Sequence, residues 1–220
     1  MKITIIIPTV SFGRFSLLFK MIKSIHRGLY KDFCIVIVID GNRKLYETIG
    51  AKVEKLYSRS VSVILNKERR GWVFSTNRVL KEFNSPYYIY ASDDLIFPSD
   101  CIENAMITMK ERFPDGYGVV SLGRKVKAIF GLFGNKWVEH FPKREVFCPY
   151  YIHYSADREH TEFMKKIGKF AYSPKRDSQV KHFRLKVETC IISRSSRSRD
   201  LILRSERKKN NRLWGINFDR

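Results

Sequence analysis

The sequence has few cysteines and no long apolar run. No two cysteines stand in a C-x-x-C spacing, which argues against a zinc knuckle or a thioredoxin-type site. We interpret all of them as reduced thiols, which favours a cytoplasmic protein. They are Cys34, Cys101, Cys148 and Cys190. The apolar run Ile3–Ile7 is short and stops at Pro8, so it predicts neither a signal peptide nor a membrane span.

Carboxylates are also scarce relative to basic residues. The chain has 22 Asp and Glu against 42 Lys and Arg, a formal net charge of +20. This balance indicates an anionic partner: nucleic acid, an anionic membrane surface or a phosphorylated substrate. We find no RNP motif, zinc module or helix-turn-helix, which makes nucleic acid the less favoured of the three.

The composition is that of a folded domain. Hydrophobic residues make up 44% of the 220 residues and aromatic residues 14%, enough for a sizeable core. Short β-branched runs alternate with segments of helical periodicity in the first half, which predicts a mostly parallel, doubly wound α/β sheet flanked by helices. The expected strands are 3–7, 34–39, 61–65, 87–91 and 118–122. Ligands of such sheets bind at the carboxyl ends of the strands, where Thr9, Asp40, Asp93 and Asp94 stand.

The second half is less regular. Residues 127–138 contain a Phe-Gly-Asn turn between apolar runs and predict a hairpin or flap. A short helix is expected at 157–167, with short strands at 170–172 and 179–183. We divide the chain into a domain of residues 1–192, with a nucleotide-binding half (1–124) and an acceptor-side half (125–192), and a basic tail, 193–220.

The tail crowds basic residues between apolar ones. A helix from about Arg199 to Trp214 would place Leu201, Ile202 and Leu213 on one side. Such a helix can lie on an anionic membrane with Trp214 at the interface. Binding of nucleic acid and a disordered tail are the alternatives.

Six segments in order resemble the nucleotide-sugar glycosyltransferases of family 2. They are IIIPTV, IVIVIDGN, RRGWVFSTNR, YYIYASDDLIFPSD, YSADREHTEF and VKHF, between Ile3 and His182. The resemblance implies the GT-A fold, a Rossmann-like sheet that binds a nucleoside diphosphate sugar.

The resemblance also implies a metal loop at Ser92–Asp94. A divalent cation neutralises the charge of a leaving diphosphate, and Mn²⁺ and Mg²⁺ prefer carboxylate oxygen. Asp94 would be the direct ligand, Asp93 would face the ribose or a metal-bound water, and His182 would join the metal. Ser92 replaces the first of three acidic residues that are frequent in the family. The alternatives are that the acidic pair caps a turn and that His182 is structural.

By the same resemblance, a nucleotide pocket is expected at Pro8, Thr9, Arg14, Asp40, Asn77 and Asp93. A carboxylate such as Asp40 can accept hydrogen bonds from a base or from ribose hydroxyls. An ordinary Asp-Gly turn is the alternative for Asp40. Guanidinium groups suit phosphate oxygens, so three arginines are candidates to bind the diphosphate, with solvated surface charge as the alternative for each: Arg69, Arg70 and Arg78.

The resemblance further implies that the catalytic base lies in the acidic pair of the fifth segment. Direct displacement at an anomeric carbon needs a carboxylate that takes the proton of the acceptor hydroxyl. We predict Asp157 for this role, with Glu159 in reserve; a plain helix cap is the alternative. Four histidines have no comparable context and are interpreted as surface or packing residues: His26, His140, His153 and His160.

These features predict a metal-dependent, inverting glycosyltransferase. The donor would be a UDP-, dTDP- or GDP-sugar and the acceptor a glycan or a lipid-linked molecule, with the protein peripheral on the inner face of a membrane. The Gly-rich loop of a nucleotidylyltransferase is absent after the first strand, where Pro8, Thr9, Val10 and Ser11 stand. The alternative from another class is a polyanion- or nucleic-acid-binding protein on a non-catalytic fold of this type.

Overall fold

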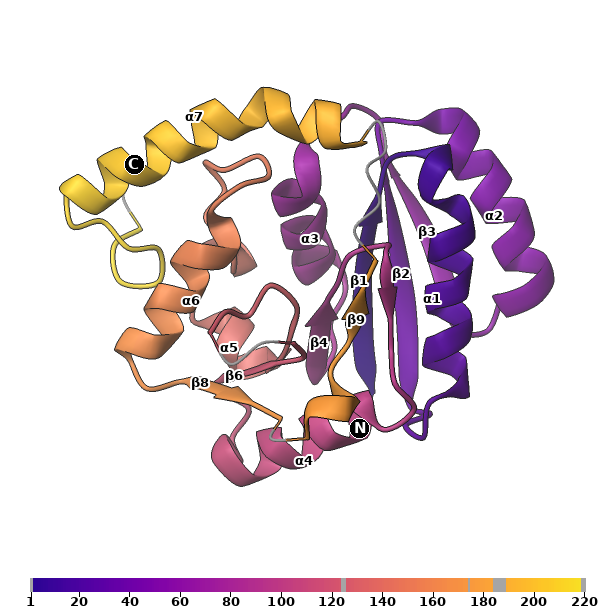
Figure 1. The fold of residues 1–220 in the computed structure, drawn as a ribbon, viewed down its shortest axis with the longest axis horizontal. Helices are drawn as coiled ribbons and strands as arrows, with labels where there is room; N and C mark the ends of the chain where they lie inside the picture. Colours follow the sequence, from indigo (N-terminus) through magenta and orange to yellow (C-terminus); the bar gives the residue numbers. More distant parts are fainter. Residues whose placement is uncertain (1, 124–125, 174, 184–188, 219–220) are drawn as a thin grey trace.

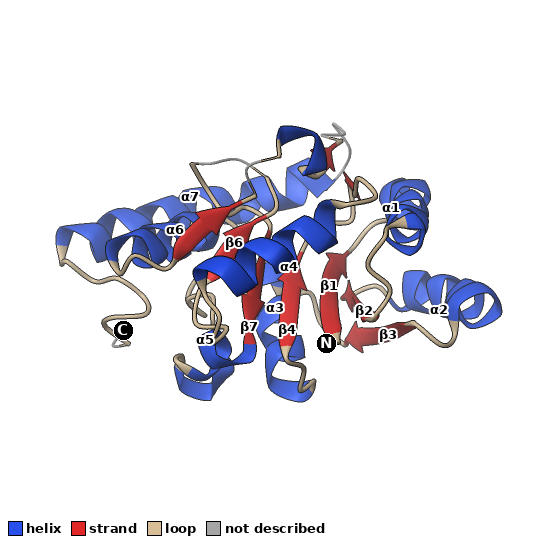
Figure 2. Cartoon of the chain, turned by 90° about the horizontal axis from the view of Figure 1, so that it is seen from below, coloured by secondary structure: helices blue, strands red, loops and turns tan. Residues whose placement is uncertain are grey.

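A computed structural model describes residues 2–123, 126–173, 175–183 and 189–218. Seven strands form one sheet in the order β3-β2-β1-β4-β7-β6-β8, with helices on both faces (Figures 1 and 2). The strands are β1 (Ile3–Thr9), β2 (Phe33–Asp40), β3 (Val61–Asn66), β4 (Tyr87–Tyr90), β6 (Val119–Ser121), β7 (Gly131–Gly134) and β8 (Phe170–Tyr172). The helices are α1 (Phe15–Arg27), α2 (Arg43–Tyr57), α3 (Gly71–Glu82), α4 (Cys101–Arg112), α5 (Asn135–Glu139), α6 (Ala156–Lys166) and α7 (Thr189–Lys209).

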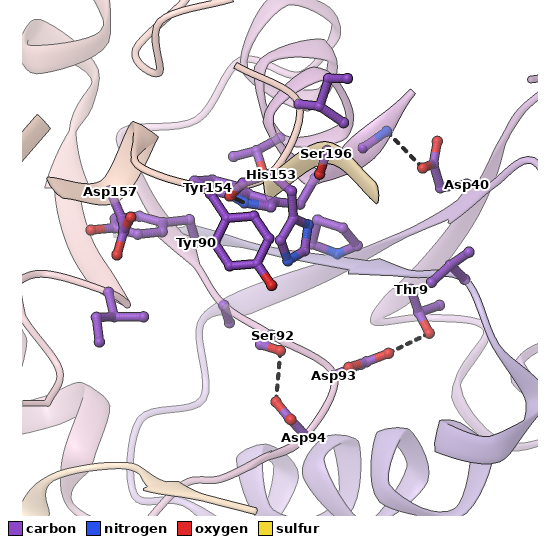
Figure 3. Close-up of a pocket in the computed structure, with 18 of the residues that line it drawn as sticks. Thr9, Asp40, Tyr90, Ser92, Asp93, Asp94, His153, Tyr154, Asp157 and Ser196 are labelled. Carbon is purple, nitrogen blue, oxygen red and sulfur yellow. Dashed lines mark hydrogen bonds between the residues drawn. The ribbon is translucent and has the colours of Figure 1, made fainter. Parts of the chain in front are cut away.

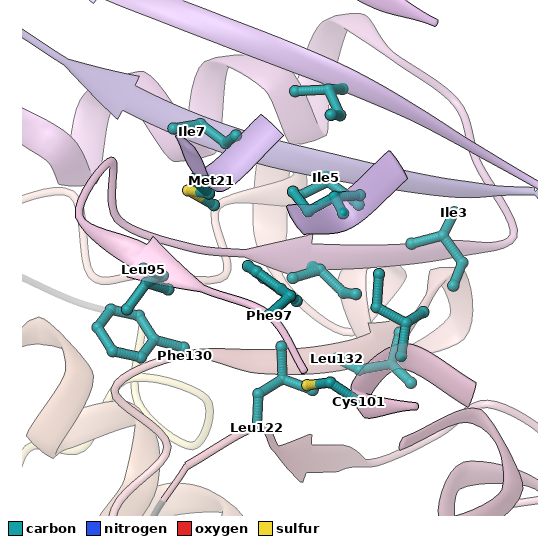
Figure 4. Packing of buried hydrophobic residues seen from close by; sticks show 14 of the residues in the cluster. Ile3, Ile5, Ile7, Met21, Leu95, Phe97, Cys101, Leu122, Phe130 and Leu132 are labelled. Atoms are coloured by element: carbon teal, nitrogen blue, oxygen red, sulfur yellow. The ribbon is translucent and has the colours of Figure 1, made fainter. Parts of the chain in front are cut away.

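The central strands are buried on both faces, because each face carries its own core. Alternate side chains of a strand point to opposite faces. Ile5 and Ile7 pack with α1, α2 and α4, whereas Ile6 and Val36 pack with α3, α5 and α6. Figure 4 shows the first of these cores around Ile5, where Met21 of α1 lies close by. The β-branched runs of the sequence are therefore strands in the middle of a three-layer α/β/α domain, and the predicted fold class is confirmed.

One strand runs against the others. β7 pairs antiparallel with both β4 and β6, whereas the pairs β1–β2, β2–β3, β1–β4 and β6–β8 are parallel. The predicted hairpin or flap at 127–138 is wrong. Gly134 ends β7 and Asn135 begins α5, so the Phe-Gly-Asn segment joins a strand to a helix. The apolar run before this segment lies in β7 and the run after it lies in α5, and both are buried.

A second sheet is small but important for the site. β5 (Leu95–Ile96) pairs antiparallel with β9 (Lys181–His182). The predicted strand 179–183 is thus shortened to two residues. This pairing places His182 opposite Leu95, the residue that follows Asp94.

The basic tail belongs to the folded body. α7 begins at Thr189, ten residues before the predicted start, and ends at Lys209, so the predicted boundary at 192/193 falls inside a helix. Figure 1 shows α7 lying across the side of the molecule that carries α3 and α6. Asp200, Arg207 and Trp214 are buried at 0%, 3% and 4% exposure. Trp214 is therefore a packing residue, and its predicted place at a membrane interface is wrong. No helix in the described part of the chain is long and apolar enough to cross a bilayer.

Candidate active site

Three neighbouring strands end at one cavity of about 590 Å³. β2, β1 and β4 are adjacent and parallel, so their carboxyl ends meet at the same edge of the sheet. Thr9 ends β1, Asp40 ends β2, and the loop after β4 carries Asp93 and Asp94. Figure 3 shows these side chains around the cavity.

Arg14 joins the two carboxylates of the acidic loop. Its Nη1 lies 2.7 Å from Asp93 Oδ1 and 3.1 Å from Asp94 Oδ2. Thr9 Oγ1 donates to Asp93 Oδ2 at 2.6 Å, and Ser92 Oγ donates to Asp94 Oδ1 at 2.6 Å (Figure 3). Ser92, which stands where the family often has a third acid, thus holds Asp94 in place.

The two carboxyl groups differ in acidity. Burial raises the pKa of Asp93, in spite of the opposing charge of Arg14 and the hydrogen bond from Thr9. Burial also acts to raise the pKa of Asp94, but hydrogen bonds from His182 and Ser92 and the charge of Arg14 outweigh it and leave the pKa lowered. Asp94 is therefore ionised over a wider pH range than Asp93, which suits a metal ligand.

His182 reaches Asp94 through the β5–β9 pairing. Its Nε2 lies 3.2 Å from the Asp94 carboxylate, and its ring packs edge-on against Phe130 at 5.3 Å between centroids. No group of three or more His, Cys, Asp or Glu side chains converges as a metal cage in the described ranges. Protein-bound Mg²⁺ commonly has one or two carboxylate ligands and completes its shell with substrate phosphates and water, and imidazole suits transition metals. The pair of Asp94 and His182 fits a cation of this kind.

Asp40 holds the start of α3. Its Oδ1 accepts hydrogen bonds from the Arg70 N–H and from Asn66 Nδ2, both at 2.9 Å, and its Oδ2 accepts one from the Gly71 N–H at 2.8 Å. The carboxylate has about four acceptor positions, these bonds use three of them, and Asp40 lines the cavity. Gly71 has φ +88°, and a Cβ on it would stand 2.3 Å from the carbonyl oxygen of Ile152. Only glycine allows α3 and the Ile152 loop to meet here.

Asp157 approaches the cavity from the opposite wall. It lies in the first turn of α6, and Figure 3 shows it across the cavity from the acidic loop. Burial raises the pKa of its carboxyl, and the charges of Arg158 and Lys127 oppose the shift only in part. A carboxylate whose pKa moves toward neutrality is a better proton acceptor.

The structure does not bring Asn77 and Glu159 into the cavity. Asn77 is buried and bonds the backbone of Phe147 through both ends of its amide, at 2.7 and 3.1 Å. Glu159 is fully buried and is bound by Arg207 and by the N–H of Trp214. Both side chains hold segments together, because their hydrogen-bonding capacity is used by the protein itself.

The remaining predicted residues divide in the same way. The other predicted site residues line the cavity, and Arg69 lines it as well. These residues are Pro8, Thr9, Arg14, Asp40, Asp93, Asp94, Asp157 and His182. Arg78 turns toward β3, where its Nη1 donates to the Leu65 carbonyl at 2.8 Å, and Arg70 stacks on Phe74. These two arginines do not line the cavity.

Sequence reasoning missed part of the wall. His153 lines the cavity, a position that its interpretation as a surface or packing residue did not predict. Burial lowers the pKa of His153 to about 4 against the opposing charge of Asp200, which leaves the ring neutral at pH 7. Ser196 and Arg199 of α7 line the cavity as well.

Comparison with known proteins agrees with this geometry. The profile of the family described as glycosyl transferase family 2 matches residues 4–164. The chain therefore belongs to glycosyl transferase family 2. No curated protein sequence matches it.

Solved structures show the same GT-A fold at low identity. The chain is similar to the mannosyltransferase PcManGT from Pyrobaculum calidifontis in complex with GDP-Man and Mn²⁺, with a TM-score of 0.61 and 16% identity over 79% of this chain and 55% of that one. It is similar to S. aureus TarS 1-349 in complex with UDP-GlcNAc, with a TM-score of 0.64 and 13% identity over 86% of this chain and 60% of that one. It is also similar to GalNAc-T7 with UDP, GalNAc and Mn²⁺, with a TM-score of 0.68 and 12% identity over 84% of this chain and 44% of that one. The chain thus spans about half of the length of these proteins.

Proposed function

We propose that the chain transfers a sugar from a nucleoside diphosphate donor to an acceptor hydroxyl. The observation that carries the proposal is the convergence of Asp94, His182 and Asp157 on one cavity at the carboxyl ends of the central strands. The volume of about 590 Å³ lies within the range of cofactor and substrate sites. Arg69 supplies positive charge on its wall for a diphosphate, whereas the charge of Arg14 is offset by Asp93 and Asp94.

The donor is proposed to be a UDP-, dTDP- or GDP-sugar bound with Mn²⁺ or Mg²⁺. When bound, the cation neutralises the charge that develops on the leaving diphosphate. Asp94 and His182 would hold it, and Ser92 orients the Asp94 carboxylate. Thr9 and Asp40 would face the base and ribose. The comparison structures whose names include GDP-Man, UDP-GlcNAc or UDP support a nucleotide donor.

We infer a single displacement with inversion. The acceptor oxygen forms a bond to the anomeric carbon while the bond from that carbon to the diphosphate oxygen breaks, and the acceptor proton passes to Asp157. Burial of Asp157 supports this role, since a desolvated carboxylate binds a proton more readily. Asp157 and Asp94 lie at different sides of the cavity (Figure 3), and an in-line displacement needs the base and the leaving group on opposite sides of the anomeric carbon.

The acceptor is proposed to be a glycan or a lipid-linked molecule at a cytoplasmic membrane face. The outer surface of α7 supports this, since Leu201 and Ile202 are 42% and 59% exposed, and the exposed Lys208 and Lys209 follow about two helical turns later. An interleaved surface of this kind binds anionic lipid through charge and apolar contact.

A thermal-shift screen of UDP, dTDP, GDP, CDP and ADP with and without Mn²⁺ tests the proposal. A ligand that binds the native state raises the melting temperature by mass action. We expect one nucleotide to raise it and the rise to require the metal. If none does, while polyanions such as heparin stabilise the protein at low salt, the non-catalytic polyanion-binding function replaces this one.

A further inference from the structure

A second cavity adjoins the first at the predicted base. It measures about 510 Å³ and shares Ile129, Tyr154 and Asp157 with the cavity at the strand ends. Asp157 therefore stands between the two cavities. A carboxylate that accepts the proton of an acceptor hydroxyl must contact the acceptor, so the second cavity has the right position for the acceptor.

Hydrogen bonds fix the walls of this second cavity. Thr161 Oγ1 accepts the N–H of Ala128 at 3.2 Å and donates to the carbonyl of Asp157 at 2.7 Å, which ties residues 126–129 to α6. Lys165 Nζ donates to the Val126 carbonyl at 2.8 Å. On the α7 side, Asp200 accepts the backbone N–H groups of three successive residues at 2.7–3.1 Å: Ile152, His153 and Tyr154. The cavity is thus a preformed part of the fold.

Its lining is cationic. Lys127, Arg158 and Arg197 contribute positive charge, and Asp157 is the one acidic residue among the lining side chains that the structure describes. No ion pair within the described ranges joins these three cations to a carboxylate, whereas neighbouring Arg204 and Arg207 are paired with glutamates. Arg197 instead lies over the Tyr154 ring, 5.8 Å from its centroid. Asp157 offsets part of the positive charge at this wall, and the remainder is available to a ligand.

We propose that this cavity binds an acceptor that carries a phosphate group beside the hydroxyl to be glycosylated. The inference rests on the proposed function and specifies the acceptor of that site. The three cations of the lining exceed the single negative charge of Asp157, which leaves a positive charge of two. A phosphate monoester carries about two negative charges at neutral pH and so matches it. Guanidinium groups of Arg158 and Arg197 match phosphate oxygens. Val126 and Leu201, which are 63% and 42% exposed, provide apolar surface at the same wall.

The phosphate can belong to a soluble phosphorylated glycan or to the diphosphate that links an acceptor sugar to a polyprenyl chain. Two pairs of probes distinguish these sources: glucose 1-phosphate with glucose, and geranyl diphosphate with geraniol. Binding of each to the full chain is measured by isothermal titration calorimetry. Saturating UDP or GDP with Mn²⁺ is present, so that the donor cavity is filled.

The variant Arg158→Gln/Arg197→Gln removes two charges from the cavity, and both side chains are exposed, so the fold is preserved. The matched control Lys20→Gln/Lys23→Gln removes two charges from the exposed face of α1. We expect wild type to bind a phosphorylated probe at least 10-fold more tightly than its neutral counterpart. The cavity variant should lose at least 10-fold of that affinity, and the α1 variant none.

Equal affinity of wild type and the cavity variant overturns the inference, and so does an equal loss in the α1 variant, which would reflect net charge alone. Nucleotide binding is titrated separately in wild type. Its absence would remove the proposed function, whereas a normal nucleotide titration with no preference for phosphorylated probes would remove only the acceptor assignment.

Discussion

Glu159 and Arg207 form a buried ion pair that joins α6 to α7. Arg207 Nη2 lies 2.8 Å from Glu159 Oε1, and the two side chains are 3% and 1% exposed. The same carboxylate accepts the hydroxyl of Tyr151 and the N–H of Trp214. All of its charge is used inside the protein, which explains why Glu159 does not serve the cavity.

Removal of one partner of this pair should destabilise the fold. Arg207→Met removes the cation that is hydrogen-bonded to the buried Glu159 carboxylate and leaves the more distant Arg204, at 3.8 Å; breaking a buried pair in this way typically costs about 3–5 kcal/mol. We expect the free energy of unfolding in urea to fall by that amount. Lys208→Met, at the exposed neighbouring position, should change it by less than about 0.5 kcal/mol. Similar stabilities of the two variants would contradict a structural role for the pair.

If Asp94 is a metal ligand, the variant Asp94→Ala should lose metal-dependent nucleotide binding. This variant should bind UDP or GDP at least 10-fold more weakly in Mn²⁺, a loss of about 1.4 kcal/mol. EDTA should weaken nucleotide binding by wild type and have no effect on the variant. Asp115→Ala removes an exposed carboxylate that bonds Lys136, and it serves as the control. A metal-dependent affinity in Asp94→Ala equal to that of wild type would show that the loop holds no cation.

The role of Asp157 predicts both a rate and a pH dependence. Asp157→Asn should keep donor binding and lower transfer by about 10²-fold or more, in line with the loss of a general base. Since burial raises the pKa of Asp157, the acidic limb of kcat/KM in wild type should lie at higher pH than for an ordinary aspartate. Wild-type activity in the variant would exclude Asp157, and loss in Glu159→Gln at unchanged stability would return the role to Glu159.

The same shift has a consequence for stability. A carboxyl whose folded-state pKa is raised favours folding below its unfolded pKa, near 3.9, and that contribution is lost as pH rises through the folded pKa. At pH 7 the ionised, desolvated Asp157 therefore opposes folding. We expect Asp157→Asn to melt at a higher temperature than wild type at pH 7, with the difference shrinking toward pH 4. A lower melting temperature at pH 7 would mean that the carboxylate is stabilised in the fold.

The strand ends could be predicted from sequence because buried parallel strands leave uninterrupted β-branched runs. Thr9, Asp40 and Asp94 follow directly from them. Two other features left no such signal. The β5–β9 pairing that brings His182 to Asp94 is two residues long on each side, too short for any periodicity. Asp157 and Glu159 are two positions apart on a helix, so they cannot share a face, and sequence alone did not show which one faces the cavity.

The inward side of α7 escaped prediction for a different reason. Ser196, Asp200 and Arg207 recur at helical spacing and are buried, yet all are polar. Hydrophobic periodicity detects only apolar faces. On this face the contacts are polar: Asp200 accepts hydrogen bonds from backbone N–H groups, and Arg207 pairs with Glu159. Leu201 and Ile202 are apolar but exposed, and they led to the prediction of an amphipathic helix that does not pack on the domain.

The outward side of α7 carries the last prediction, binding to anionic lipid. Because Asp200 and Arg207 hold α7 in the fold, deletion of residues 193–220 would unfold the protein rather than test its surface. Lys208→Gln/Lys209→Gln changes two exposed positions instead. Each basic residue near an anionic surface contributes about 1 kcal/mol, so the loss of two should weaken binding to phosphatidylserine vesicles by about 30-fold at low salt. Co-sedimentation measures this, with Lys20→Gln/Lys23→Gln on α1 as the control of equal charge and neutral vesicles as the control of lipid charge. If both variants sediment with anionic vesicles as wild type does, the outer face of α7 is not a membrane-binding surface.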